Sequence, residues 1–173
     1  KTWEDVTKSE EYVDQLCRYI IDDFSVFEEV QNDDSMGFMV VASSSEQARS
    51  MQEWFENNST VKTALVLYDT EENKEKQEYF RGKKDNVTGK TVIKYKGVIV
   101  YNMLLTGFDA PRLKRLYLLR TIKEHNLLQT LARVNRAYRK MQYGYVVDFV
   151  DITEEYEETN RCYLEELRSD LED

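Results

Sequence analysis

The sequence predicts an α/β domain built on a mostly parallel β-sheet with helices on both faces. Three observations predict this class. Five short apolar runs have the length of strands, and stretches with helical spacing separate most of them. The runs are continuously apolar rather than alternating, which is typical of strands buried on both faces. Strands that alternate with helices along a chain favour parallel pairing through crossover connections.

Each helix or strand is predicted from the spacing of apolar residues within its own segment. Helices are expected where apolar residues recur three or four positions apart, and strands where several apolar residues stand together. In chain order, the expected elements are a helix at 10–30, a strand at 37–42, a helix at 46–56, a strand at 63–68, a helix at 71–81, strands at 97–101 and 116–119, a helix at 126–138, a strand at 145–150 and an acidic helix at 153–171. Residues 83–96 have no clear period and are interpreted as a basic connection.

Composition limits the class of protein. A chain of 173 residues, 41% of them hydrophobic, is long enough for one compact domain with a core. Cys17 and Cys162 match no metal-ligand or redox spacing, so we expect two separate buried thiols in a reduced, cytoplasmic protein. No apolar run approaches the roughly 20 residues of a membrane helix, and no membrane partner is expected. The start at Lys1 suggests an excised piece of a longer protein.

The charge is strongly segregated along the chain. The net charge is -9, yet residues 81–147 carry 15 Lys and Arg against 3 Asp and Glu. Residues 1–80 carry 7 basic against 19 acidic side chains, and residues 148–173 carry 2 against 11. A block this basic is a candidate phosphate-facing surface. The alternative is that the acidic blocks neutralise it in the folded domain.

The predicted helix near residue 130 has a core face and a cationic face. On a helical wheel, Gln129, Arg133, Arg136 and Lys140 fall in a narrow stripe opposite the leucines. Arginine side chains one turn apart suit a phosphate chain that develops charge during transfer, because each guanidinium offers a fixed fork of donors. The stripe is therefore a candidate arginine finger; the other interpretation is an ordinary solvated face.

A second candidate segment, at residues 103–111, directly follows the predicted strand at 97–101. Gly107 allows the backbone to approach a ligand closely, Thr106 offers a hydroxyl, and Asp109 offers a carboxylate for a ribose hydroxyl or an arginine. A turn with an Asx-type hydrogen bond would use the same residues, so the segment alone leaves both interpretations open.

Taken together, these segments resemble a known family. The stretches LLTGFDAP (104–111), HNLLQ (125–129) and ARVNR (132–136) closely resemble motifs V and VI of the R subunits of type I restriction-modification enzymes, which are superfamily 2 helicase-like translocases. Residues 37–55 look like motif IV, and the resemblance covers about 10–150. The sequence departs from the usual pattern at Tyr101-Asn102, where the family has an acidic residue.

The resemblance implies a fold and a domain division. The fold is a RecA-like three-layer sandwich with a mostly parallel sheet and flanking N- and C-terminal helices. Residues 1–152 would form the second RecA-like motor domain, including the N-terminal helix at 9–30, and residues 153–173 an acidic helical tail that leads into the next domain.

The resemblance also implies a nucleotide-facing set. Arg133 and Arg136 would be the catalytic residues that reach the phosphates of ATP, which would be held with Mg²⁺ mainly by a first RecA-like domain in the same subunit. Gln129 would support the two arginines. Gly107 and Asp109 would approach the nucleotide sugar and couple it to motif VI. The chain itself is expected to supply no metal ligands.

The expected macromolecular partners are double-stranded DNA and the methyltransferase and specificity subunits of the type I complex. Thr106 would face DNA backbone phosphate, and Ser43 and Ser44, after the motif IV strand, are weaker candidates for the same contact. The serine hydroxyls suit an ordinary helix cap equally well. His125, the only histidine, is interpreted as a cap or hydrogen-bonding residue at the start of the next helix.

Some chemistry is expected to be missing from the chain. Gly89-Lys90-Thr91 mimics the end of a Walker A loop, but Lys84 stands where that pattern needs glycine. The full subunit would be an ATP-hydrolysing type I site-specific deoxyribonuclease, whereas this chain alone is expected to be inactive. The alternatives are a non-catalytic nucleic-acid-binding module, another superfamily 2 helicase domain, and a small-molecule enzyme of the doubly wound class.

Overall fold

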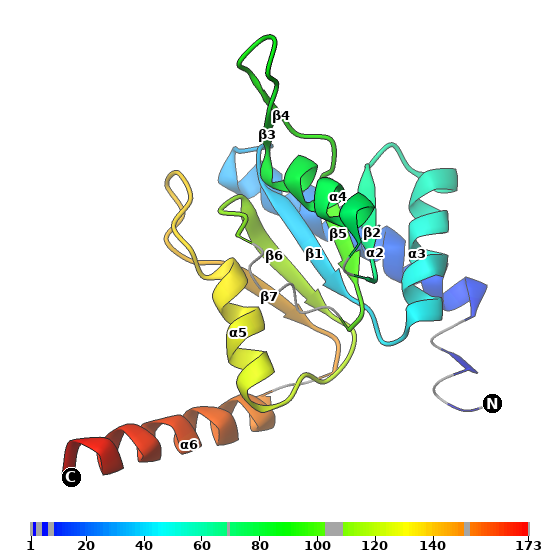
Figure 1. Ribbon diagram of the computed structural model, residues 1–173. Helices are drawn as coiled ribbons and strands as arrows, with labels where there is room; N and C mark the ends of the chain where they lie inside the picture. Colours follow the sequence, from blue (N-terminus) through cyan, green and yellow to red (C-terminus); the bar gives the residue numbers. More distant parts are fainter. Residues whose placement is uncertain are drawn as a thin grey trace.

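The computed structural model describes residues 2, 5–6, 9–68, 70–102, 109–150 and 153–172. Its centre is a sheet of five parallel strands in the order β2-β5-β1-β6-β7 (Figure 1). The strands are β1 (Gly37–Val41), β2 (Thr63–Val66), β5 (Gly97–Val100), β6 (Leu113–Leu118) and β7 (Tyr145–Asp148). The predicted α/β class with a parallel RecA-like sheet is confirmed.

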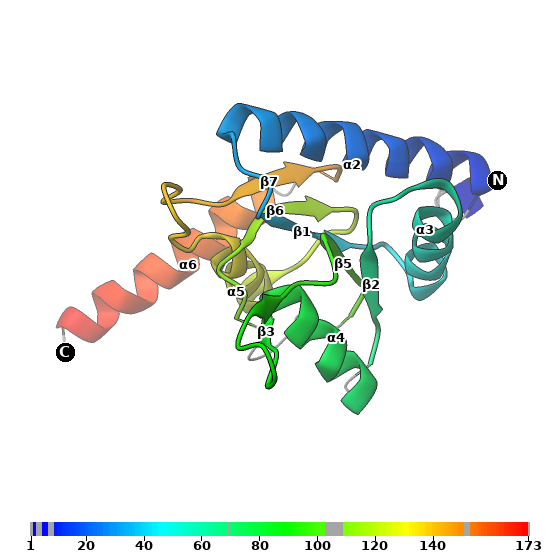
Figure 2. The ribbon, with the colours of Figure 1, turned by 90° about the horizontal axis from the view of Figure 1, so that it is seen from above.

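Helices cover both faces of this sheet (Figure 2). The helices α2 (Glu10–Gln31) and α3 (Ser45–Asn58) pack on one face. The helices α4 (Glu71–Arg81) and α5 (Glu124–Val134) pack on the other. The last helix, α6 (Thr153–Glu172), contacts α5 and extends away from the sheet (Figure 1).

The position of β1 at the centre of the sheet explains why its sequence is apolar throughout. All five of its residues are buried, and the strand pairs with β5 on one side and β6 on the other. Phe38 and Val40 join the cluster under α2 and α3, while Met39 and Val41 join the cluster under α4 and α5. Full burial of such a side chain stabilises the fold by about 1.5–3 kcal/mol. Both faces of β1 therefore belong to the core.

Local signals set the helix ends. The Ser9 hydroxyl accepts a hydrogen bond from the Tyr12 amide and caps α2, as the Thr70 hydroxyl caps α4. Asn32 ends α2 in the left-handed conformation with φ 51°, a position that asparagine tolerates well. No helix among the described residues has the length and apolar character needed to cross a membrane.

Three expectations need correction. The basic connection contains a short antiparallel hairpin, β3 (Lys83–Lys84) with β4 (Thr91–Val92), whose two-residue strands are too short to show a period. Strand β6 begins three residues before the predicted 116, because buried hydrogen bonds accommodate its charged residues. Cys17 is buried, but Cys162 is exposed on α6, since that helix extends away from the sheet (Figure 1) and its residues 161–171 are all exposed.

Candidate functional site

The site forms where the segment before β6 meets the segment after α5. Asp109 accepts a hydrogen bond from Nη1 of Arg136, and the two side chains form an ion pair. Both lie at the surface, with 49% of the Asp109 side chain and 46% of the Arg136 side chain exposed. The structure thus joins the two segments that the sequence singled out, although 27 residues separate these two positions.

Arg136 does not lie on the helix. Helix α5 ends at Val134, with Asn135 as its C-cap, so the prediction of a helix to residue 138 is wrong. Gln129 and Arg133 remain on α5, one turn apart; Gln129 is exposed, and Arg133 is partly buried with its Nε atom shielded from solvent. Arg136 and Lys140 therefore reach solvent from the loop that follows α5, and not from a helical stripe.

A buried lysine explains where α5 stops. Lys114 of β6 is fully buried, and its Nζ atom donates hydrogen bonds to the carbonyl oxygens of Val134, at 3.0 Å, and Arg136. These carbonyls belong to the helix end and the turn after it, where main-chain acceptors lack helical partners. Gly144 lies against the Val134 carbonyl so closely that a Cβ at Gly144 would collide with it. Both contacts favour a turn over further helix.

Sequence reasoning missed Lys114. Burial lowers the pKa of its ammonium group, and the positive charge of Arg136 lowers it further. The signal in the sequence was a pair of cations, Lys114 and Arg115, directly before the apolar run at 116–119, which is an unusual place for charged side chains in a buried strand. Lys114 is a part of this site through its contact with the Arg136 main chain.

The first serines after β1 have hydrogen-bond partners within the domain. The Ser44 hydroxyl accepts from the Gln47 amide at 3.0 Å and caps α3. The amide and hydroxyl of Ser43 donate to Oε1 of Gln47 at 2.7 and 2.8 Å. The structure gives the Ser44 hydroxyl the cap role that the sequence left open, and DNA contact by Ser43 and Ser44 stays a prediction.

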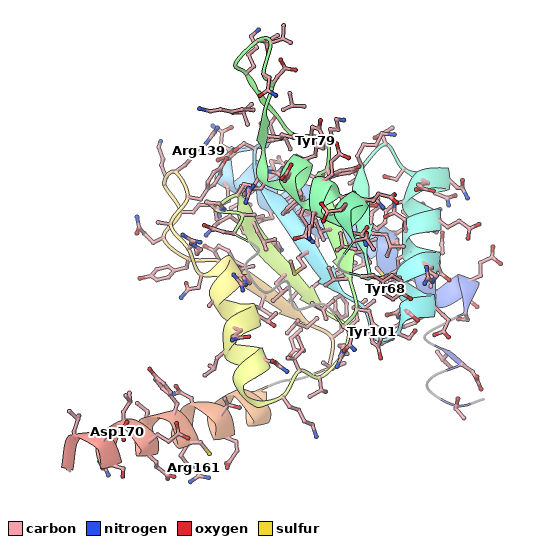
Figure 3. The ribbon with its side chains drawn as sticks, viewed as in Figure 1. Tyr68, Tyr79, Tyr101, Arg139, Arg161 and Asp170 are labelled. Carbon is pink, nitrogen blue, oxygen red and sulfur yellow. The ribbon has the colours of Figure 1, made fainter. Side chains whose placement is uncertain are left out.

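A polar hollow of about 320 Å³ opens beside the start of α5. Asn102, Arg120, Lys123 and Asn126 are among the residues that line it, and they come from the loops after β5 and β6 and from α5. The Arg120 guanidinium lies 5.0 Å from the ring centroid of Tyr101, which is labelled in Figure 3. The carboxyl ends of parallel strands are the usual ligand-facing edge of such sheets.

The remaining predicted site residues either lie outside the described residues or have a different position from the one expected. Thr106 and Gly107 lie outside the described residues. Helix α5 begins at Glu124 with Lys123 as its N-cap, so His125 is inside the first turn and is not the cap; the helix starts earlier than its apolar period indicated. In the part of the chain that the structure describes, no group of three or more His, Cys, Asp or Glu side chains could hold a metal ion.

Comparison with known proteins assigns the family. Residues 7–151 match the family described as type I restriction enzyme subunit R domain 3. The chain belongs to this family. The R-subunit domain is also 30% identical to the putative type I restriction enzyme MjaIXP endonuclease subunit of Methanocaldococcus jannaschii, over 97% of this chain and 17% of that protein.

Further relatives agree with this assignment. The type I restriction enzyme HindI endonuclease subunit of Haemophilus influenzae is 42% identical over 39% of this chain and 7% of its own length. The R-subunit domain therefore spans only a small part of the curated relatives it matches.

Solved structures share the fold. A fragment of a putative HsdR subunit of a type I restriction enzyme from Vibrio vulnificus YJ016 superposes with a TM-score of 0.56 at 17% identity, covering 88% of this chain and 31% of that one. T4 UvsW superposes with a TM-score of 0.55 at 18% identity, covering 87% and 28%. These structures show the fold that the chain shares with them, and the family match makes it domain 3 of a type I restriction enzyme R subunit.

Proposed function

We propose that this R-subunit domain is the second RecA-like motor domain of an ATP-driven DNA translocase. In this proposal, Arg136 and Arg133 act on ATP that a first RecA-like domain of the same subunit holds together with Mg²⁺. The observation that carries the proposal is the ion pair between Asp109 and Arg136. It links the two segments that resemble motifs V and VI, at a solvent-facing position that a neighbouring domain can reach.

The Arg136 side chain suits an anionic ligand. A guanidinium group has five N–H donors, and the ion pair with Asp109 engages one nitrogen, Nη1. The remaining donors stay available to phosphate oxygens, which arginine binds through parallel hydrogen bonds. ATP supplies the phosphoryl group whose charge rises during transfer, and Arg136 would stabilise that charge in the manner of an arginine finger.

Asp109 gives this arginine a second partner. A carboxylate beside the guanidinium holds it at the domain surface and competes with any phosphate that approaches it. We infer that Arg136 exchanges between Asp109 and phosphate during each cycle, which would couple motif V to the nucleotide. Gln129 and Gly107 would assist at the phosphates and the sugar.

The DNA part of the proposal rests on charge. The basic block at 81–147 offers a surface for double-stranded DNA, and Thr106, Ser43 and Ser44 would face the DNA backbone. Movement along DNA would require the full subunit, which we propose to be a type I site-specific deoxyribonuclease working with methyltransferase and specificity subunits. We expect the domain alone neither to hydrolyse ATP nor to cut DNA.

A second function is favoured by the hairpin. Lys84 and Lys90 are exposed on the β3–β4 hairpin, which projects from the domain in Figure 1. No ion pair within the described residues involves either lysine. A non-catalytic nucleic-acid-binding module would use such a projection, and its DNA affinity would fall with salt and not depend on Arg136.

The test is DNA-stimulated ATPase activity of the complete R subunit assembled with its partner subunits. Arg136→Ala should lower the activity by about 10³-fold or more, since an arginine finger contributes roughly 10³ to 10⁵ in rate. DNA loading, measured separately by gel shift, should stay unchanged.

Arg139→Ala is the matched control. Arg139 lies in the same loop, is 60% exposed on its side chain and contacts Asp33 at 3.4 Å rather than Asp109. Its replacement should leave ATPase activity within about twofold, as expected for a surface pair of small energy. Near wild-type activity of Arg136→Ala would reject the motor role and favour the binding module.

A further inference from the structure

We propose that Lys114 is a positioning residue for Arg136. Its buried ammonium group holds two main-chain carbonyls, those of Val134 and Arg136, and thereby fixes the turn from which the Arg136 side chain reaches Asp109. The role of Lys114 in catalysis rests on the proposed function of Arg136. The role of Lys114 in placing that arginine does not.

The environment of Lys114 argues against a passive role. A buried charge destabilises a fold unless hydrogen bonds compensate for its lost hydration. The compensation at Lys114 comes from two carbonyl oxygens, and no ion pair within the described residues involves this lysine. A leucine or methionine would fill the same space at lower cost in free energy. The charge is explained by what it holds, which is the end of α5.

The position of the two carbonyls makes the contact specific. The carbonyl end of a helix carries partial negative charge, so a cation there is favourable. The Lys114 contact spans the helix end, because Val134 is the last residue of α5 and Arg136 lies two residues beyond it. Holding both carbonyls sets the direction in which the chain leaves the helix, and with it the starting point of the Arg136 side chain.

The next residue of β6 provides a built-in comparison. Arg115 points to the opposite face of the sheet and pairs with Asp23 of α2 at 2.6 Å. It is a cation on the same strand, one position away, and its hydrogen bonds within the described residues go to Asp23 and not to the end of α5. A variant at Arg115 therefore reports what loss of a partly buried β6 cation does to the fold alone.

The first experiment measures kcat and KM for ATP in the complete R subunit. Lys114→Met should lower kcat by about 100-fold while KM for ATP changes less than about twofold, because a displacement of roughly 1 Å at a catalytic group costs on this order. Arg115→Met should destabilise the subunit and leave kcat of the folded protein unchanged. Equal kcat values for Lys114→Met and wild type would overturn the proposal.

A second variant disturbs the same turn without removing the positive charge of Lys114. Gly144→Ala places a methyl group against the Val134 carbonyl and should shift the turn away from Lys114. If Lys114→Met does not fold, Gly144→Ala still tests the positioning role of Lys114. A selective loss of kcat in Gly144→Ala supports that role, and an unchanged kcat opposes it. Adding Lys114→Met to Arg136→Ala should cost no further kcat, because the two act as one unit.

A measurement without ATP separates the two proposals. In the complete subunit carrying Asp109→Cys and Arg136→Cys, with the exposed Cys162 replaced by serine, a short bismaleimide should cross-link the two positions, and Lys114→Met should slow that reaction at least tenfold. An unchanged cross-linking rate rejects the positioning role, whatever Arg136 does. A slowed rate together with a fully active Arg136→Ala variant rejects the motor function and leaves the positioning role standing.

Discussion

The charged side chains of β6 have different hydrogen-bond partners on the two faces of the sheet. On the α2 face, Arg115 and Tyr117 both donate to the Asp23 carboxylate, so the cation is neutralised inside the domain. On the α5 face, the hydrogen bonds of Lys114 within the described residues go to main-chain carbonyls, and Arg136 pairs with a half-exposed carboxylate. The difference teaches that the charged pair on the α2 face is enclosed within the domain, whereas the ion pair between Arg136 and Asp109 lies at the surface.

The packing follows the same division. The α2 face holds an aromatic group in which the Phe38 ring lies 5.0 Å from Phe24 and 5.9 Å from Tyr117, centroid to centroid. The buried cluster on the α5 face is mostly aliphatic, with side chains such as Leu116, Leu118 and Leu127, and Phe80 is its one ring among the buried residues described. Large rings fix a rigid platform under α2. Changes on the α2 face should therefore alter stability, and changes on the α5 face should alter activity.

The largest stability effect is expected at Phe38. Phe38→Ala should lower the free energy of unfolding by about 3–5 kcal/mol, because it leaves a cavity among the buried rings. Denaturant unfolding of the chain measures this value. Val26→Ala, at a position on α2 that is 58% exposed, serves as the control and should change it by less than about 0.5 kcal/mol. Similar values for both variants would contradict the assignment of a rigid α2 face.

The next effect is expected at Asp23. Burial alone would raise the pKa of this carboxyl, but hydrogen bonds from Arg115 and Tyr117 hold the pKa below its ordinary value. Asp23→Asn should cost about 2 kcal/mol at neutral pH, the scale of a hydrogen bond to a charged group. The same unfolding measurement, with Asp22→Asn at an exposed neighbouring position as control, checks it.

The Asp23 pair also predicts a pH dependence. A lowered folded pKa means that the unfolded chain binds the proton more readily, so the stabilisation is present above the ordinary Asp pKa of about 3.9. It is lost as the pH falls below that value and through the folded pKa. Wild type should therefore lose more stability than Asp23→Asn between about pH 5 and pH 2. Parallel curves for the two proteins would show that Asp23 is not held in the ion pair.

A smaller effect is expected at Ser44. Ser44→Ala removes the α3 cap and should cost about 1 kcal/mol, whereas Ser44→Asp keeps a capping oxygen and should preserve stability. The two variants also test the proposed DNA contact. If Ser44 faces a phosphate, Ser44→Asp should weaken DNA binding by the complete subunit; unchanged affinity would leave only the cap.

The smallest stability effect is expected at Asp109. Asp109→Asn should change the free energy of unfolding by less than about 1 kcal/mol, because exposed ion pairs contribute little. The same change should disturb ATPase activity of the complete subunit, since Arg136 loses its competing partner. A stability loss as large as that of Asp23→Asn would show that the α5 face is as structural as the α2 face.

Much of the fold could be predicted from the sequence, because the strands and helices carry strong local periods. The apolar run at β1 and the amphipathic pattern of α2 each specify burial without reference to the rest of the chain. The hairpin was missed because two-residue strands have no period, and its turn depends on Gly89 at φ 68° and on Asp85. Short-range signals of this kind are visible only once the pairing is known.

The site was predictable in part. Asp109, Arg133 and Arg136 stand in motifs that carry a resemblance, so the sequence alone selects them as candidate site residues. The end of α5 does not, because a helical wheel continues through Arg136 and the feature that stops it, Lys114, lies 22 residues from Arg136. The sequence does not show which distant carbonyls a buried lysine will bind. It shows only that a lysine stands at an unusual place, next to a predicted strand.

The order of strands in the sheet has a consequence for synthesis of the chain. The central strand β1 lies between β5 and β6, whose sequences follow it by some 60 and 75 residues. While the ribosome extends the chain, β1 has no strand partner and its five apolar residues cannot be covered on both edges. The nascent segment around residues 37–41 therefore keeps an unpaired, apolar strand edge until β6 has been synthesised and can pair with it.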